Sequence, residues 1–326
     1  MKTISEICQL PLRKVQSEVL HKLNPNKINI IQAPTGVGKS FIAAHIAQKH
    51  KGAMIITPTR ALQKQYIQEM QIENLWGKAH YDCHKYEVSC DQCDEHFSSE
   101  TDHLNDEGKA KISQEHERQC EYKQEKAAFS NDRYGVTGVE ICYFGIRNQS
   151  KCLIIDEAHN LIDKFSNLSG CKISSKSTLF GDAFKSLNSR FSNNKIGFEA
   201  YLNGCLREAK RNSADKNSAR KERKTKFIEK LQVICGKQSY FSYEVVYDNN
   251  SVPSVELKKL NFRFEFAKLT ENFDHVYLMS ATLPDVPLFC ALLGIAKSDM
   301  NFINVESPFD PSKVKINCYT SLLQNK

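Results

Sequence analysis

The chain has 326 residues, a length typical of about two domains. Its 45 Lys and Arg residues outnumber 38 Asp and Glu residues, which gives a formal net charge of +7. Twelve cysteines occur without a hydrophobic signal segment or a membrane segment, so the composition argues against a disulfide-stabilised secreted domain and against a membrane protein. We therefore expect a cytoplasmic, intracellular protein without a membrane partner.

The first predicted elements are a strand at residues 28–31 and a helix, joined by a glycine-rich loop. The loop and the start of the helix read Ala33, Pro34, Thr35, Gly36, Val37, Gly38, Lys39 and Ser40. The two glycines allow the backbone to curl so that successive N–H groups face phosphates. Lys39 can reach the outer phosphates, and Ser40 can offer its hydroxyl to Mg²⁺. The segment from Thr35 to Ser40 is thus the predicted triphosphate site, with a glycine-rich turn that binds nothing as the alternative.

Four cysteines downstream could bind one metal centre. They are Cys83, Cys90, Cys93 and Cys120. The middle two form a C-x2-C pair, whose thiolates can bind the same metal. Zinc takes four cysteines, or three cysteines and one histidine, and five histidines lie nearby. These are His80, His84, His96, His103 and His116.

An acidic stretch separates the third and fourth of these cysteines. Residues 94–119 hold eight acidic and three basic side chains. We expect a solvated or disordered loop here. Because its charge would repel phosphates, such a loop would point away from a nucleic-acid strand or mask the strand's site.

A second motif follows a strand predicted at residues 152–155, which is apolar throughout and therefore reads as buried and parallel. Asp156, Glu157, Ala158 and His159 come next. Ligands gather at the carboxyl edge of parallel sheets, so Asp156 is placed to hold Mg²⁺ and Glu157 to polarise the water that attacks a phosphate. A helix cap at Asp156 is the alternative, and it does not exclude the metal role.

A basic run lies further along the chain. Residues 207–230 carry ten Lys and Arg against four Asp and Glu, so most of the net charge is concentrated there. As a solvated helix the run needs no ligand, because its charges can pair along the helix. As a nucleic-acid track it would neutralise phosphates and bind in a salt-dependent way. Both readings stay open.

Together these motifs resemble the superfamily 2 helicases of the DEAH type, and specifically the XPD/DinG family of iron–sulfur DNA helicases. Further stretches match in the family's order: residues 11–16, residues 57–62 after a strand predicted at 53–56, residues 278–283, and residues 307–309. By this resemblance Arg13 and Gln16 read the adenine of ATP. Thr57, Thr59 and Arg60 match motif Ia, which grips the backbone of single-stranded nucleic acid.

The resemblance also assigns a coupling role to two segments. Ser280, Ala281 and Thr282 match motif III, which couples hydrolysis to strand movement in this family. His159 is expected to link the nucleotide site to motif III rather than to perform chemistry. Residues 307–309, Ser-Pro-Phe, match the junction between the family's first and second motor domains.

The implied fold is α/β: a RecA-like P-loop NTPase domain with a parallel sheet, interrupted by a cysteine-rich Fe–S module and a mainly helical Arch-like insertion. The expected segments are motor 1–79, Fe–S module 80–125, motor 126–167, Arch-like insertion 168–268, motor 269–309, and a tail or truncated second motor domain 310–326. In this family the four cysteines hold a [4Fe–4S] cluster, although spacing alone does not separate it from zinc.

The implied function is ATP- and Mg²⁺-dependent unwinding of DNA, with movement 5′→3′ on single-stranded DNA. Residues 310–326 suffice for one strand, predicted at 314–319, and not for a second RecA-like domain with its arginine finger. We therefore expect a partner polypeptide or a second copy to supply that domain. A non-unwinding nucleic-acid-binding or regulatory subunit is the alternative. A P-loop kinase or GTPase would share the loop but not the helicase motifs.

Overall fold

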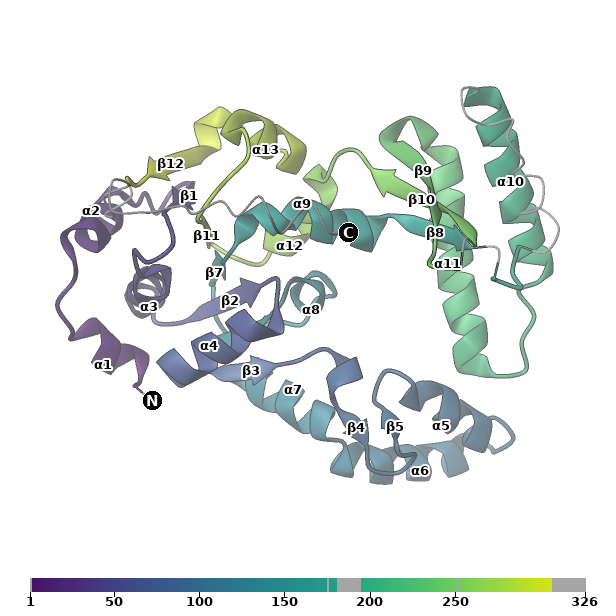
Figure 1. The fold of residues 1–326 in the computed structure, drawn as a ribbon. Coiled ribbons are helices and arrows are strands. Elements are labelled where there is room, and N and C mark those ends of the chain that lie inside the picture. Colours follow the sequence, from purple (N-terminus) through teal and green to yellow (C-terminus); the bar gives the residue numbers. More distant parts are fainter. Residues whose placement is uncertain (1, 175, 181–194, 251, 307–326) are drawn as a thin grey trace, which may run out of the picture.

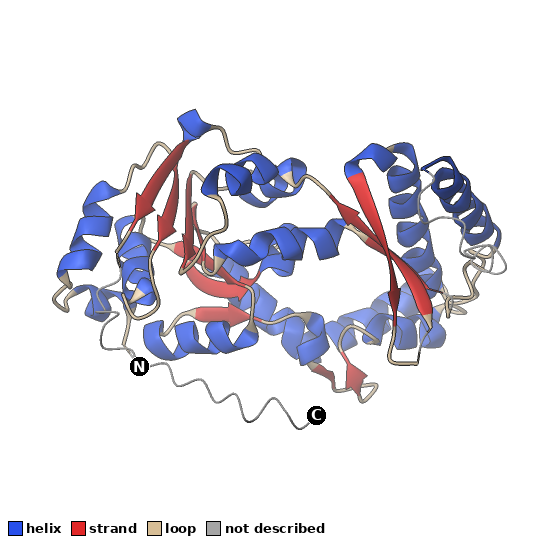
Figure 2. Cartoon of the chain, turned by 45° about the horizontal axis from the view of Figure 1, so that its top comes forward, coloured by secondary structure: helices blue, strands red, loops and turns tan. Residues whose placement is uncertain are grey.

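The computed structural model describes residues 2–174, 176–180, 195–250 and 252–306. A motor body built on one large sheet lies at one end of the molecule, and an insertion with its own small sheet lies at the other (Figures 1 and 2). The predicted junction at residues 307–309 and the predicted strand at 314–319 fall outside the described residues. Within the described residues, no helix is both long and apolar enough to cross a membrane.

The motor sheet has seven strands in the order β12-β1-β11-β7-β2-β6-β3, and all neighbours run parallel. They are β1 (Ile28–Gln32), β2 (Ala53–Thr57), β3 (Glu73–Leu75), β6 (Tyr134–Gly138), β7 (Cys152–Ile155), β11 (His275–Ser280) and β12 (Met300–Asn304). The three strands predicted from the sequence are confirmed as β1, β2 and β7. Because β1, β11, β7 and β2 are consecutive neighbours, the segments that follow them meet at one edge.

Alternate residues of each strand enter two cores, one on each face of the sheet, as the pleat requires. In β1, for example, Ile30 joins one core and Ile31 the other, both fully buried. Helices cover both faces and bring their own apolar side chains. They are α1 (Ile4–Cys8), α2 (Lys14–Lys22), α3 (Lys39–Lys49), α4 (Arg60–Met70), α7 (Glu121–Asn131), α8 (Val139–Tyr143), α9 (Leu161–Ser169), α12 (Arg263–Thr270) and α13 (Val286–Leu293). This rigid frame fixes the edge where the motifs lie.

The cysteine module is small and mostly helical. It contains η1 (Lys78–His80), β4 (Asp82–Cys83), β5 (Val88–Ser89), α5 (Cys93–Thr101) and α6 (Asp106–Gln119). The expectation of a loop at residues 94–119 is therefore wrong. The placement of the charges explains why. Acidic side chains lie in the first turn of α6 and basic ones in its last turn, which stabilises the helix because they offset its dipole: Asp106 and Glu107, then His116 and Arg118. Asn105 caps the start through the Gly108 amide.

The insertion pairs two helices with an antiparallel sheet of order β8-β10-β9. Its elements are β8 (Cys171–Ser174), α10 (Lys195–Arg211), α11 (Ser218–Gly236), η4 (Gln238–Tyr240), β9 (Phe241–Tyr247) and β10 (Pro253–Lys259). The expectation of a mainly helical insertion missed this sheet. The remaining short helices are η2 (Ala158–Asn160) and η5 (Lys297–Asp299).

The acidic helix α5 contacts the basic helix α11. Glu95 binds Arg220 at 2.8 Å and Arg223 at 2.6 Å. Ser218, the first residue of α11, donates from its amide and its hydroxyl to Asp102, each at 2.9 Å. Part of the basic run is thus neither fully solvated nor free to bind nucleic acid, because acidic side chains of the cysteine module bind it.

Candidate nucleotide site and metal centre

The glycine-rich loop leads from β1 directly into α3. Gly36 and Gly38 have φ angles of 86° and 88°, a region that side chains rarely allow. A Cβ at Gly38 would also lie 2.5 Å from the Gln16 side-chain nitrogen. Glycine is therefore needed at Gly38 for both its backbone angle and its close neighbour, and the loop it forms opens onto the first turn of α3.

Arg13 and Gln16 hold this loop from behind. Arg13 donates to the Gly36 carbonyl at 3.0 Å, and Gln16 donates to the Val37 carbonyl at 2.9 Å. The Arg13 amide in turn donates to the Gln16 side-chain oxygen at 2.9 Å. The two residues expected to read adenine thus also bind the carbonyl side of the loop. Of the loop amides, Val37 donates to the Pro34 carbonyl at 3.3 Å.

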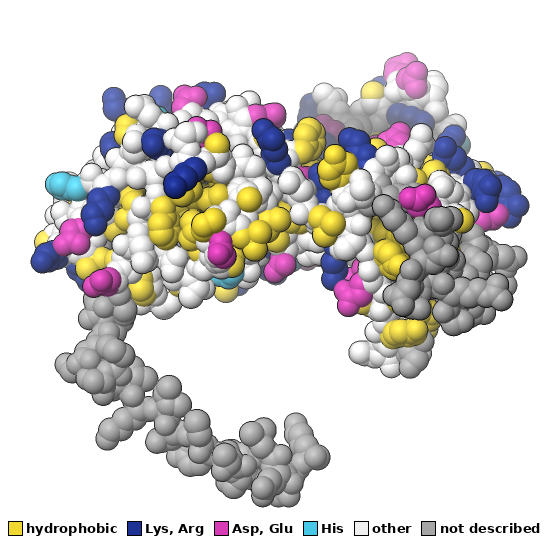
Figure 3. Space-filling model, turned by 90° about the horizontal axis from the view of Figure 1, so that it is seen from above, with side chains coloured by type: hydrophobic (Ala, Val, Ile, Leu, Met, Phe, Trp, Pro, Cys, Tyr) yellow, Lys and Arg dark blue, Asp and Glu magenta, His cyan; other side chains and the backbone are white. Residues whose placement is uncertain are grey.

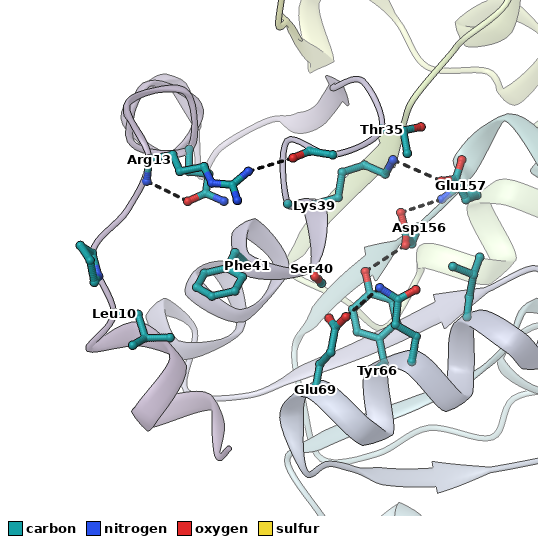
Figure 4. Close-up of a pocket in the computed structure, with 16 residues that line it drawn as sticks. Leu10, Arg13, Thr35, Lys39, Ser40, Phe41, Tyr66, Glu69, Asp156 and Glu157 are labelled. Carbon is teal, nitrogen blue, oxygen red and sulfur yellow. Dashed lines mark hydrogen bonds and ion pairs between the residues drawn. The ribbon is translucent and has the colours of Figure 1, made fainter. Parts of the chain in front are cut away.

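The loop borders a cavity of about 680 Å³, within the range of small-molecule sites. Figure 4 shows Thr35, Lys39 and Ser40 facing Asp156 and Glu157 across it. The other lining residues are Leu10, Pro11, Arg13, Gln16, Gly36, Gly38, Phe41, Leu62, Gln65, Tyr66 and Glu69. All predicted triphosphate contacts except Val37 therefore line one cavity, with both predicted acidic residues.

The two acidic residues occupy different environments at the end of β7. Asp156 is nearly buried, and its amide is bound to the Ile56 carbonyl at 2.9 Å. Burial raises the pKa of Asp156, against the hydrogen bond from Tyr66, which lowers it. Glu157 is more exposed, and its Oε1 lies 3.3 Å from Lys39 Nζ. The buried carboxylate of Asp156 is therefore suited to binding a metal ion, and the more accessible carboxylate of Glu157 is suited to accepting a proton.

The sequence analysis missed Tyr66. Tyr66 lies on α4, the helix between β2 and β3. Its hydroxyl donates to Asp156 Oδ2 at 3.0 Å. Tyr66 is buried, so this bond fixes the carboxylate in a site screened from water. A tyrosine among polar residues of an amphipathic helix gives no signal of that contact, because only the fold brings it to Asp156.

A chain of hydrogen bonds connects Glu157 to the segment after β11. His159 Nδ1 lies 3.3 Å from Glu157 Oε2 and 2.8 Å from Ser280 Oγ. Ser280 donates to the Thr282 carbonyl at 2.8 Å, and Asn160 donates to His159 Nε2 at 2.9 Å. The ring of His159 thus bridges Asn160 on one side and Ser280 on the other. Ala281 lies in the same segment, between the two motif III residues.

The predicted DNA contacts lie at the carboxyl end of β2 with different exposure. Thr57 is buried and donates to the Thr59 carbonyl at 3.1 Å. Thr59 caps α4 by accepting from the Leu62 amide. Arg60 is exposed, 3.1 Å from His80 and 5.2 Å from the centre of the Trp76 ring. Of the three predicted side chains, Thr57 is buried, whereas Thr59 and Arg60 are exposed and accessible to a phosphate.

The four cysteines converge in the cysteine module, although 36 residues separate the first from the last. Burial and then the neighbouring Cys120 raise the pKa of Cys90 to about 11. Burial and then a hydrogen bond with Cys83 raise the pKa of Cys93 to about 12. Crowded, buried thiols resist ionisation, and a bound cation reverses this because it stabilises the thiolates. The donor set therefore fits a metal.

One histidine joins this group. His116 Nε2 on α6 lies 3.3 Å from both Cys83 Sγ and Cys93 Sγ. Donor atoms of Cys83, His84 and His116 also lie within 4.8 Å of one another. Of the five histidines considered from the sequence, His116 is thus the one bonded to two of the four thiols.

Comparisons with known proteins agree with this geometry. The family described as "Type III restriction enzyme, res subunit" matches residues 9–200. A solved structure titled "XPD_Helicase" aligns with a TM-score of 0.57 at 16% identity, covering 91% of this chain and 63% of that one. A second, titled "Truncated XPD", aligns with a TM-score of 0.50 at 15% identity, covering 90% of this chain and 100% of that one.

The chain thus spans just under two thirds of the first solved structure. No curated protein sequence matches it significantly. The expected RecA-like fold is confirmed by these alignments, which extend over the motor, the cysteine module and the insertion. The chain belongs to the family described as the type III restriction enzyme res subunit, and its fold is similar to that of the two structures titled as XPD.

Proposed function

We propose that this chain hydrolyses ATP and couples hydrolysis to movement on single-stranded DNA. The observation that carries the proposal is the meeting of Lys39 and Glu157, 3.3 Å apart, in a cavity that Asp156 also lines. One side of the cavity offers a cation and loop N–H groups for phosphates, and the other offers two carboxylates. That pairing suits phosphoryl transfer to water.

Each group has a separate task in the proposed reaction. The amides around Gly38 and the Lys39 ammonium bind the phosphates and keep the terminal one in place. Ser40 and Asp156 hold Mg²⁺, which neutralises charge on the phosphate oxygens. Glu157 accepts a proton from the attacking water. Its carboxylate must leave Lys39 partly, because the phosphates compete for the same ammonium.

His159 and Ser280 form the proposed route from hydrolysis to the DNA. A change at Glu157 alters the partners of His159, and His159 is bonded to the segment that follows β11. The resemblance to XPD and DinG implies that movement runs 5′→3′. Thr59 and Arg60, at the neighbouring carboxyl end of β2, are the proposed DNA contacts on the motor.

Full activity needs further positive charge at the terminal phosphate. Among the described residues, the cations that line the cavity are Arg13 and Lys39, and Arg13 is bound to the loop. We propose that a second RecA-like domain, from a partner polypeptide or a second copy, supplies an arginine. Such a residue contributes about 10³-fold to 10⁵-fold in rate.

Steady-state ATP hydrolysis with and without single-stranded DNA tests the proposal. We expect DNA to stimulate turnover and Glu157→Gln to abolish the stimulated rate while ATP still binds. Adding a polypeptide with a second RecA-like domain should raise the rate further. DNA-independent turnover that Glu157→Gln leaves unchanged would contradict the proposal. Turnover that appears only with such a polypeptide, without any unwinding, would favour the alternative, a non-unwinding regulatory subunit that binds ATP but hydrolyses it only with a partner.

For the metal centre we propose a [4Fe–4S] cluster held by Cys83, Cys90, Cys93 and Cys120. The support is the convergence of three buried thiols and the half-buried Cys120, together with the similarity in fold to the structures titled as XPD. Zinc is the second candidate, because His116 contacts two of these thiols and zinc accepts three cysteines and one histidine. Protein prepared without oxygen should contain about four irons and absorb at about 400 nm if the cluster is present. Stoichiometric zinc without iron would favour the alternative.

A further inference from the structure

We propose that this chain binds the triphosphates of adenosine and guanosine alike, because it holds a purine by its ring faces and not by its edge. The inference rests on the proposed hydrolysis of ATP and concerns the same cavity. Figure 4 shows Leu10, Arg13 and Phe41 toward the end of that cavity away from the two carboxylates. Since Lys39 and Glu157 occupy the phosphate end, the base of a bound nucleotide lies among these three side chains.

The Gln16 side chain is already bonded through both atoms of its amide. Gln16 is 3% exposed, its Oε1 accepts from the Arg13 amide, and its Nε2 donates to the Val37 carbonyl, each bond at 2.9 Å. A glutamine that recognises adenine needs both amide atoms, one for N6 of the base and one for N7. Turning Gln16 toward a base would break both bonds and leave the Val37 carbonyl unpaired in a buried place, which is costly. Gln16 therefore shapes the loop and leaves the base edge without a matching partner.

The other polar side chains that line the cavity near this end do not favour adenine over guanine. Arg13 Nη1 donates to the Gly36 carbonyl at 3.0 Å. The remaining N–H groups of Arg13 can donate to N7, an acceptor that both purines carry. On α4, Gln65 donates to Glu69 at 2.8 Å, so these two side chains bind each other. The described lining residues that complete this end are apolar: Leu10, Pro11 and Phe41.

Flat and apolar surfaces are thus what holds the base. The planar guanidinium of Arg13 can stack on an aromatic face, and the half-buried ring of Phe41, in the first turn of α3, offers a second such surface. Stacking tolerates any base, because every base has a π-face. A site that hydrogen-bonds the edge of a substrate rejects analogues strongly, whereas an apolar site discriminates weakly between molecules of one shape. Adenine and guanine share the same double ring, so they should bind alike.

Competition against a fluorescent ATP analogue, with Mg²⁺ and the full chain, tests the inference. ATP and GTP should displace the analogue with dissociation constants within about fivefold of each other, since recognition of a base edge contributes at least about that factor. Inorganic tripolyphosphate, which has no base, should bind at least about tenfold more weakly. Phe41→Leu should weaken ATP and GTP by the same factor, about threefold to tenfold, and leave tripolyphosphate unchanged.

Two further variants separate the base from the loop and from the outer surface. Gln16→Ala should loosen the loop and therefore weaken ATP, GTP and tripolyphosphate equally. Hydrophobic side chains also gather on the outside of the motor, as the view from above shows (Figure 3), so a nucleotide could stack there instead. Phe302→Leu changes an exposed ring on β12, outside the cavity, and should alter none of the affinities.

Three results would overturn the inference and leave the proposed function standing. One is a preference of the wild-type chain for either nucleotide larger than about fivefold. Another is a Gln16→Ala chain that loses ATP binding but keeps GTP binding, because Gln16 would then recognise adenine. The third is equal weakening by Phe302→Leu and Phe41→Leu, which would place the base on the outer surface. If ATP, GTP and tripolyphosphate all fail to bind the wild-type chain, the proposed function fails as well.

Discussion

The nucleotide site and the cysteine site are built in opposite ways. The first lies at the edge of a seven-stranded parallel sheet with a core on each face, so its residues are held by the fold itself. The second is held by two strands of two residues each, by the starts of α5 and α7 and by the end of α6. A large frame preorganises its site, whereas a small one depends on what it binds.

This difference predicts which site survives loss of one side chain. Removing a group from the nucleotide site should change function and leave the structure intact. Removing a ligand from the cysteine site should change the structure of the module. The predictions below test that contrast, beginning with the largest expected effect.

Two variants of the nucleotide site should differ in kind. Glu157→Gln should slow hydrolysis by about 10²-fold to 10⁴-fold, the usual contribution of a general base, while ATP still binds. Lys39→Ala should weaken ATP binding by about tenfold or more, since it removes a charged partner of the phosphates. Titration with a fluorescent ATP analogue and single-turnover hydrolysis separate the two effects.

Both proteins should unfold at the same temperature as the wild type, within a few degrees, because the sheet does not depend on these side chains. Equal loss of ATP binding in the two variants would contradict the role given to Glu157. A large fall in melting temperature would contradict the claim that the frame holds the site by itself.

Cys93→Ser should remove the metal and loosen the cysteine module. The remaining cysteines would lose the cation that stabilises them as thiolates and cross-links the module. Metal analysis should show loss of the bound metal, and hydrogen exchange should show faster exchange in α5 and α6 than in the wild type. Cys142→Ser is the matched control, because Cys142 is equally buried but packs in the motor core.

His116→Ala decides how the metal is held. A cluster bound by four thiolates should keep its iron, with an altered absorption spectrum and reduction potential, because a hydrogen-bonding neighbour is lost. A zinc site that uses His116 should bind its metal at least about tenfold more weakly. Unchanged iron content together with an unchanged spectrum and potential would show that His116 has no part in the site.

Tyr66→Phe should weaken Mg²⁺ binding about threefold to tenfold, since it removes a hydrogen bond to a nearly buried carboxylate. The pH dependence gives a sharper test. The pKa of Asp156 is already raised by burial, so protons compete with Mg²⁺ as the pH falls through it, and the variant should show this competition at higher pH. Tyr277→Phe is the control, because its hydroxyl contacts His50 instead, at 2.7 Å. An identical pH profile in wild type and Tyr66→Phe would contradict the positioning role.

The nucleotide site could be predicted from the sequence more fully than the cysteine site, because more of it is built from local segments. The glycine-rich loop, the acidic pair and their strands could be predicted from neighbouring residues, because β1 and β7 are short apolar runs directly followed by their motifs. Tyr66 could not, since its contact with Asp156 depends on how α4 packs beside the sheet. In the cysteine module, metal ligands were recognisable by type, but the helices were missed because high net charge was read as disorder.

The insertion also has contacts that could not be predicted from the sequence. The cations of its basic run were countable in the sequence, but their partners were not, because Glu95 and Asp102 lie more than a hundred residues earlier in the chain. Neither β9, which is mostly exposed, nor β10, in which Val255 and Leu257 are buried, was identified as a strand from the sequence. Which charged side chains and aromatic rings far apart in the chain lie next to one another could not be predicted from the sequence.

The smallest predicted effect concerns the contact between α5 and α11, which joins the cysteine module to the insertion. Glu95→Arg should repel Arg220 and Arg223, and hydrogen exchange at the start of α11 should rise in low salt. The effect should be modest and should shrink in high salt, because these side chains face water and are screened there. Adding Arg223→Glu should restore part of the protection by re-forming an ion pair with the charges exchanged. Since Ser218 would still bind Asp102, the helices should not separate fully, and ATP binding, which rests on the sheet, should stay unchanged. Equal exchange in all three proteins at low salt would mean that the ion pairs of Glu95 do not hold the cysteine module to the insertion, and that the hydrogen bonds from Ser218 to Asp102 do so.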